Sequence, residues 1–156
     1  MCLLMPLEES FDDLCSGLAN LRIALQLVQA AAAQDEKICA DLNHFADLLD
    51  GLTKVAQKAR KAACHPVDVD NTRRTLPRCQ RQFNLLKAEF RARMGGPERI
   101  EELRKAGREE VAWHIGRCYE PLAAAERALT ACWLGLGEYA VLKPGGVIPG
   151  FAPPRS

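Results

Sequence analysis

The sequence lacks the patterns that usually indicate a membrane span or a catalytic centre. No stretch approaches the ~20 consecutive apolar residues that a transmembrane helix needs. No two cysteines form a CxxC pair, and no glycine-rich phosphate loop follows a strand pattern. β-branched residues are few, whereas Ala, Leu, Arg, Glu and Gln dominate, so helix is favoured over sheet. The sequence therefore predicts an all-α protein.

Composition and cysteine usage indicate one domain in a reducing compartment. The chain has 156 residues, of which 48% are hydrophobic and 26% are charged, as in ordinary globular domains. Its seven cysteines are an odd number without the spacing of a zinc module. The apolar start, residues 1–5, has no basic segment before it and ends at Pro6, unlike a signal peptide. We therefore expect an intracellular, cytoplasmic location and free thiols.

Apolar residues spaced alternately four and three apart predict the first two helices. The spacing persists over residues 7–32 for about four heptads, the a/d pattern of coiled coils and helical bundles. A second seam covers residues 38–63 in a different phase, and Asp35 can cap a new helix. We expect a tight turn at residues 33–36, with one long helix containing a stutter as the alternative. The first seam also leaves open a homodimer.

The most basic stretch, residues 71–94, predicts the third helix. It has seven basic side chains and a single acidic one, together with apolar residues spaced three and four apart. Pro77 fits the first turn of a helix that begins near Thr75, where its missing N–H does no harm. Asp70 and Asn71 are other candidate N-caps. The glycine pair directly after this stretch predicts the end of the helix.

A fourth helical pattern extends from Pro97 to Tyr139. An unbroken helix of that length would measure about 63 Å, well beyond the others, and Pro121 interrupts it. We therefore expect an antiparallel bundle of four long helices, the fourth kinked or split near Pro121. This bundle domain is expected to span residues 1–142. The remaining residues, 143–156, are rich in Pro and Gly, which predicts an extended tail.

Charge is distributed unevenly along the chain, although the net charge is only +1. Residues 1–50 contain two basic and nine acidic side chains, residues 51–94 eleven basic and three acidic, and residues 95–156 eight of each. Either acidic and basic helices lie side by side and neutralise each other, or a basic face remains for an acidic partner. On a helical wheel, Lys87 and Arg93 fall beside the buried stripe, where they can pair with acidic neighbours.

Seven residues are candidates for contact with a partner. Four lie on the outer face of the basic helix and three are the apolar residues of the tail: Arg74, Arg78, Arg81, Leu85, Val147, Ile148 and Phe151. The cationic face suits phosphates, an anionic lipid surface or an acidic helix. It offers no aromatic side chain on which nucleic-acid bases could stack. The apolar tail residues suit a groove on this bundle or on a partner.

The sequence contains no motif of catalytic or metal-binding residues. His114 and Cys118 stand four residues apart on one helix face, within reach of one ion, but the sequence places no further ligand beside them. A buried thiol near a hydrogen-bonded imidazole accounts for the pair without a metal. We predict no catalytic residue, no metal and no cofactor. We expect a non-enzymatic adaptor or assembly subunit that binds another protein, with polyanion binding through the third helix as the alternative.

Overall fold

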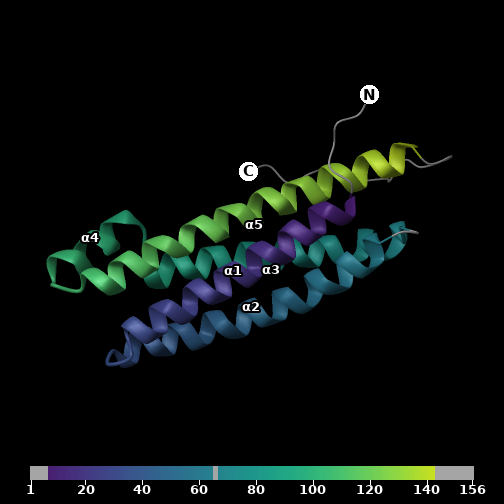
Figure 1. Cartoon of the computed structure of the whole chain (residues 1–156). Helices are drawn as coiled ribbons and strands as arrows, with labels where there is room; N and C mark the ends of the chain where they lie inside the picture. Colours follow the sequence, from purple (N-terminus) through teal and green to yellow (C-terminus); the bar gives the residue numbers. More distant parts are fainter. Residues whose placement is uncertain (1–6, 65–66, 143–156) are drawn as a thin grey trace.

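The computed structural model describes residues 7–64 and 67–142, and these residues form five α-helices joined by short turns (Figure 1). Four of the helices are long and one is short: α1 (Leu7–Ala31), α2 (Glu36–Ala63), α3 (Val69–Met94), α4 (Pro97–Lys105) and α5 (Glu109–Leu142). The described ranges contain no strand, so the all-α prediction is confirmed. The predicted tail, with its candidate residues Val147, Ile148 and Phe151, lies outside the described residues.

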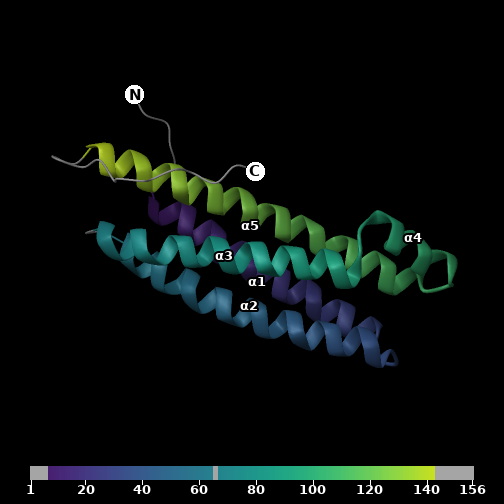
Figure 2. The same cartoon turned by 180° about the vertical axis from the view of Figure 1, so that it is seen from behind.

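The four long helices form an antiparallel bundle. Helix α1 packs against α2 and α5, and α3 packs against the same two, so each long helix has two neighbours. The start of one helix meets the end of the next: Asp12 pairs with Arg60, and Asp41 pairs with Arg93. Figure 2 shows α3 from the side that is hidden in Figure 1, with α2 beside it along the length of the molecule. The predicted bundle architecture is confirmed.

The core consists of the residues that the apolar spacing predicts. Every residue of the first two seams is buried: Leu7, Phe11, Leu14, Leu18, Leu21, Leu25, Val28 and Ala32 in the first, and Ile38, Leu42, Phe45, Leu49, Leu52, Ala56, Ala59 and Ala63 in the second. The stripe of α3 is buried as well, and Phe83 has no exposed surface. Burial of these side chains against one another is what holds the four helices together.

The first two helices are separate, with the turn where the phase of the seam changes. Helix α1 ends at Ala31 and α2 begins at Glu36. Asp35 is the N-cap of α2, and its carboxylate accepts a hydrogen bond from the backbone N–H of Ile38 at 3.0 Å. This cap satisfies a backbone donor that has no partner within the helix. The predicted turn is confirmed, and the single long helix with a stutter is excluded.

The start of α3 corrects a prediction. The helix begins at Val69 and not near Thr75, because Asp68 caps it. The Asp68 carboxylate accepts a hydrogen bond from the backbone N–H of Asn71 at 3.0 Å, which is the usual N-cap geometry. Pro77 therefore lies inside the helix and not in its first turn.

Of the kink or split predicted near Pro121, the split is wrong, because α5 continues through this residue. A proline inside a helix removes the hydrogen bond to the carbonyl four residues earlier. For Pro77 and Pro121 those carbonyls belong to Arg73 and Arg117, which are exposed residues where water can bond to the carbonyl instead. Neither proline therefore ends its helix.

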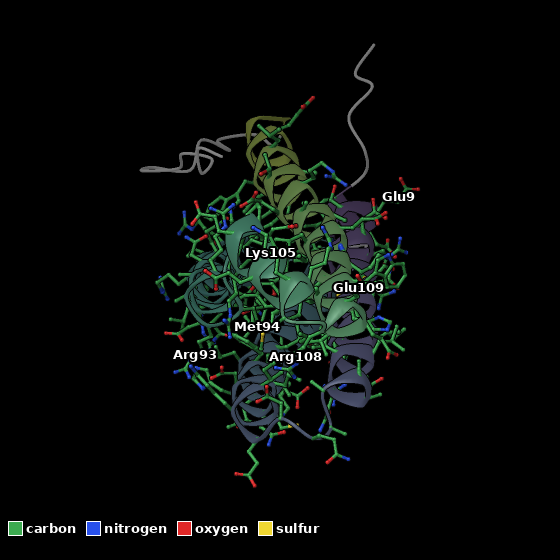
Figure 3. All side chains as sticks on the ribbon, turned by 90° about the vertical axis from the view of Figure 1, so that its left-hand side faces the viewer. Glu9, Arg93, Met94, Lys105, Arg108 and Glu109 are labelled. Atoms are coloured by element: carbon green, nitrogen blue, oxygen red, sulfur yellow. The ribbon has the colours of Figure 1, made fainter. Side chains whose placement is uncertain are left out.

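The fourth predicted helix is instead divided at Gly107, which takes a φ of 80°. The backbone N–H of Gly107 donates to the carbonyl oxygen of Arg104 at 3.1 Å. The backbone N–H of Arg108 donates to the carbonyl oxygen of Leu103 at 2.9 Å. These two bonds form a Schellman motif, for which glycine is favoured because the left-handed conformation strains other residues. Figure 3 looks along the bundle from this end, with α4 folded back beside α5.

Candidate docking surfaces

Small residues bring α1 and α5 into close contact. A Cβ atom added to Gly17 would lie 3.2 Å from the backbone N and Cα atoms of Ala125. A Cβ atom at Gly135 would lie 3.2 Å from the Cδ1 atom of Leu7. At such distances the helix surfaces touch, so larger side chains cannot fit between the two helix axes and must project to either side.

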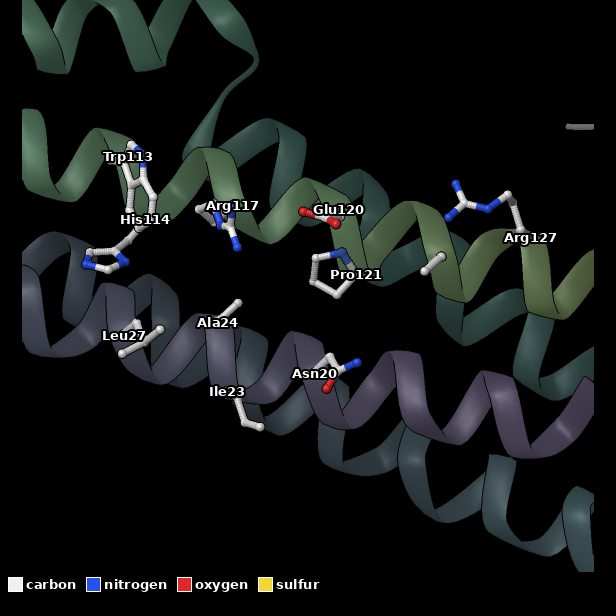
Figure 4. A pocket seen from close by; sticks show the side chains of 11 residues that line it. Asn20, Ile23, Ala24, Leu27, Trp113, His114, Arg117, Glu120, Pro121 and Arg127 are labelled. Carbon is white, nitrogen blue, oxygen red and sulfur yellow. The ribbon is translucent and has the colours of Figure 1, made fainter.

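On the outer side of this contact, large apolar side chains line a groove, which we call the α1/α5 groove (Figure 4). Ile23 and Leu27 line it from α1, and Trp113, His114 and Pro121 line it from α5. Its volume is about 390 Å³. Ile23 and Trp113 are each 56% exposed and Leu27 is 49% exposed. Three of the five large apolar side chains that the described residues expose thus meet in one place.

The aromatic end of the groove carries positive charge. The guanidinium carbon of Arg117 lies 5.1 Å from the centroid of the Trp113 ring, which is a cation–π contact. The rings of Trp113 and His114 meet edge to face, with their centroids 5.1 Å apart. Neither Arg117 nor Arg127, which also lines the groove, forms an ion pair with another residue of the described ranges. Glu120 is the groove's one carboxylate.

A second hollow continues the groove along the same pair of helices. Asn20, Ala124 and Arg127 line both hollows. Beyond them the lining becomes polar on α1, with Asp13 and Ser16, and consists mainly of alanines on α5. The outer seam between α1 and α5 is therefore an elongated depression, apolar at one end and mixed at the other.

The candidate residues of the third helix are on the surface, as the helical wheel predicts. Arg74, Arg78 and Arg81 are all exposed, and Leu85 is 49% exposed beside them. None of the three arginines forms an ion pair with a residue of the described ranges. Their role in binding a partner stays a prediction.

The two basic residues expected to pair with acidic neighbours do so. The Nζ atom of Lys87 lies 2.5 Å from the Oε2 atom of Glu126 in α5. The Nη1 atom of Arg93 lies 2.9 Å from the Oδ1 atom of Asp41 in α2. Arg93 also donates to Glu89 and thereby lowers the pKa of that carboxyl. Acidic and basic helices therefore do neutralise part of their charge, but the outer arginines of α3 take no part in this.

Two buried thiols of the described residues are poorly suited to act as nucleophiles. Burial raises the pKa of the Cys79 and Cys118 thiols to about 12, so neither is a ready nucleophile near neutral pH. The Cys118 thiol donates to the backbone carbonyl of His114 at 3.4 Å, whereas the His114 ring contacts Trp113. Across the described residues, no three His, Cys, Asp or Glu side chains gather closely enough to hold a metal ion.

Sequence reasoning did not single out the α1/α5 groove, although a signal was present. Ile23 and Leu27 stand four residues apart and both fall outside the seam of α1, which passes through Leu21 and Leu25. Trp113 likewise lies off the line of buried residues in α5. A large apolar residue outside its seam has no place in the core, so a pair at helical spacing indicates an exposed apolar stripe.

Two further findings concern membrane spans and similarity to known proteins. Within the described ranges, no helix combines the length and the apolar character needed to cross a membrane. No protein-family model matches the chain, and no curated protein or solved structure was found to match it.

Proposed function

We propose that the protein is a non-enzymatic interaction module, an adaptor or assembly subunit that binds another protein in the α1/α5 groove. The observation that carries the proposal is the meeting of Ile23, Leu27 and Trp113 in one exposed groove. Exposed apolar side chains gathered in one concave patch are typical of protein interfaces, whereas single ones are common on any surface.

The shape of the groove suits an α-helix of the partner. It follows two antiparallel helices, so a further helix laid along it would pack against both of them, as helices do within a bundle. Trp113 offers the large, partly rigid apolar area that is typical of interface hot spots. Arg117 and Arg127 would favour acidic residues at the edge of the partner helix. The expected ligand is therefore an amphipathic helix with an acidic flank.

The test compares proteins captured by the tagged wild-type chain and by two double variants. The Ile23→Glu, Trp113→Glu variant places charge in the groove, and we expect it to reduce capture of the partner at least tenfold. Two carboxylates in an apolar contact would lose their hydration without gaining a cation. Quantitative mass spectrometry of the captured proteins gives the measurement.

The Leu85→Glu, Leu134→Glu variant is the matched control. It changes two apolar residues of comparable exposure, 49% and 45%, that do not line the groove. We expect it to retain the partner, and both variants to keep the wild-type melting temperature within about 2 °C, since exposed positions contribute little to stability. If the groove variant captures the same proteins as the control, the groove is not the docking site and the proposal fails.

A further inference from the structure

The opposite side of the bundle, formed by α2 and α3, carries a surface of different character. Arg74, Arg78 and Arg81 of α3 are exposed there, at intervals of four and three residues, so they share one face of the helix. Other cations of these helices are directed at neighbouring helices: Arg60 pairs with α1 and Lys87 with α5. The outer arginines are thus the charges that packing does not use.

The register of α2 against α3 places three lysines beside this trio. A Cβ atom added to Gly51 of α2 would lie 3.8 Å from the Oε1 atom of Gln82 of α3. Lys54 and Lys58 follow Gly51 by three and seven residues, on the same side of α2, and Lys61 comes one turn later. Because the helices are antiparallel, this direction along α2 leads toward the start of α3, where the arginine trio lies. Farther along the helices, the ion pair of Arg93 with Asp41 and the contact of His44 with Glu89 keep the same register.

We call this surface the basic face, and it consists of six exposed residues: Lys54, Lys58, Lys61, Arg74, Arg78 and Arg81. None of the six forms an ion pair with any residue in 7–64 or 67–142. Exposed carboxylates lie toward its two ends, with Asp47 at one end and Asp68 and Asp70 at the other. Within the described part of the chain, its positive charge is therefore not cancelled by the protein itself.

We propose that the basic face binds the surface of a membrane that contains anionic lipid. Two antiparallel helices lying side by side present a nearly flat surface, so their outward side chains can reach one plane of headgroups together (Figure 2). Lys and Arg side chains are long enough to place their charges at that plane while the helices stay above it. Six cations within about two helical turns of each helix concentrate the attraction to an anionic leaflet.

Two features favour lipid over nucleic acid as the partner of the basic face. It has no exposed aromatic side chain on which bases could stack, since Trp113, the one large aromatic residue exposed in the described ranges, lies in the α1/α5 groove. At its edge stands Leu85, an apolar side chain that can enter the headgroup region. The groove is on the opposite side of the bundle, so a protein partner and a membrane could be bound together.

The test is co-sedimentation of the full chain with vesicles of phosphatidylcholine alone or with 30% phosphatidylserine. Each Lys or Arg near an anionic leaflet raises the partition coefficient about fivefold. We therefore expect binding to the anionic vesicles only, and a steep loss of binding between 50 and 500 mM NaCl as the Debye length shortens. Reversing two charges, in Arg74→Glu, Arg78→Glu or in Lys54→Glu, Lys58→Glu, should lower the partition coefficient at least ~25-fold in each case.

The matched control is Lys37→Glu, Lys105→Glu. It changes the net charge by the same amount, at two exposed lysines near the other end of the bundle that form no ion pair within the described ranges. We expect less than a threefold change, because these residues lie far along the bundle from the six cations of the basic face, where the attraction to the leaflet is concentrated. Far-ultraviolet circular dichroism checks that each variant is folded, and Gln in place of Glu serves for any variant that is not.

Three results would overturn the proposal. The first is no binding of wild-type protein to anionic vesicles at 50 mM NaCl. The second is an equal loss in the control variant, which would mean that net charge and not this face is responsible. The third is tight binding of the wild-type protein to a 20-base-pair DNA duplex together with no binding to vesicles, which would assign the face to nucleic acid. If only the arginine variant lost binding to the anionic vesicles, the lysines of α2 would not belong to the binding site, and the six-residue face as proposed would be wrong.

Discussion

The bundle has two sides, α1 with α5 and α2 with α3, and different interactions hold each pair of helices together. Helices α1 and α5 meet through small residues, with Gly17 against the backbone of Ala125. Helices α2 and α3 are joined at their edge by an ion pair, in which Arg93 reaches Asp41 across the interface. The outer surfaces differ in the same way. The apolar α1/α5 groove lies beside the close contact of α1 with α5, and the basic face lies beside the charged interface of α2 with α3. What a helix pair uses to pack therefore determines which side chains it leaves for a partner.

The largest expected effect tests the close contact of α1 with α5. In Gly17→Leu a side chain must enter a space where even a Cβ atom would be 3.2 Å from backbone atoms of Ala125. The helices have to move apart, so we expect a loss of about 2–3 kcal/mol in the free energy of unfolding, despite the better helix propensity of leucine. Urea denaturation followed by circular dichroism measures this loss.

The control for this prediction is a glycine of α5 that contacts nothing. A Cβ atom at Gly116 would have no atom within 4 Å, so Gly116→Ala should stabilise the protein by about 0.5–1 kcal/mol through helix propensity alone. If Gly17→Leu proved as stable as the wild type, α1 and α5 would not be in the contact described, and the comparison between the two sides would lose its first half.

The second prediction tests the charged interface of α2 with α3. Arg93→Met keeps a long apolar side chain but removes the guanidinium that bonds to Asp41 at 2.9 Å and to Glu89 at 2.8 Å. The Asp41 side chain is only 12% exposed, so it is left with an unpaired and poorly hydrated charge. We expect a loss of about 2 kcal/mol in the free energy of unfolding.

The neighbouring Arg91→Met is the control for the charged interface. Arg91 is exposed and forms no ion pair within the described ranges. Its substitution should therefore change the free energy of unfolding by no more than about 0.5 kcal/mol. Equal losses in both variants would mean that the methylene groups matter and the ion pair does not. In that case the two sides of the bundle would be held by the same kind of packing.

The sequence was sufficient to predict the helical bundle and the core of its first three helices, because the apolar spacing is a local property that burial then confirms. It also predicted the pairing of Lys87 and Arg93, since both fall at the edge of the buried stripe. It predicted a kink or a split near Pro121 because proline usually interrupts helices, but whether a lost hydrogen bond can be replaced by water depends on exposure. Gly107 was the residue that marked the break.

The candidate surfaces were predicted only in part, for a physical reason. The arginines of α3 could be found from one helix, because a helical wheel shows which side chains lie opposite the apolar stripe. The lysines of α2 and the apolar groove each need two helices in a known order and register. That order is set by how all the side chains pack together, and no single stretch of sequence contains it.

The smallest expected effect concerns one of the contacts that join the two sides. Asp35 caps α2 and lies 2.6 Å from Arg108, at the start of α5. We expect Asp35→Ala to lower the free energy of unfolding by about 1.5 kcal/mol, because it removes a helix cap and a partly buried ion pair. The comparator is Asp68→Ala. Asp68 caps α3 but forms no ion pair within the described ranges, so this variant removes a helix cap alone. Its free energy of unfolding should fall by about 1 kcal/mol.

The pH dependence of stability separates the contributions of Asp35. The backbone N–H of Ile38 and the side chain of Arg108 hold the pKa of Asp35 below its ordinary value of 3.8. A carboxyl with a lowered pKa stabilises the fold above that ordinary value, and this contribution is lost as the pH falls through the lowered pKa. The difference in stability between wild type and Asp35→Ala should therefore be largest above about pH 5 and shrink below pH 4. A difference that stays constant from pH 7 to pH 3 would mean that Asp35 does not act through its charge, and that its ion pair with Arg108 does not help to join the two sides of the bundle.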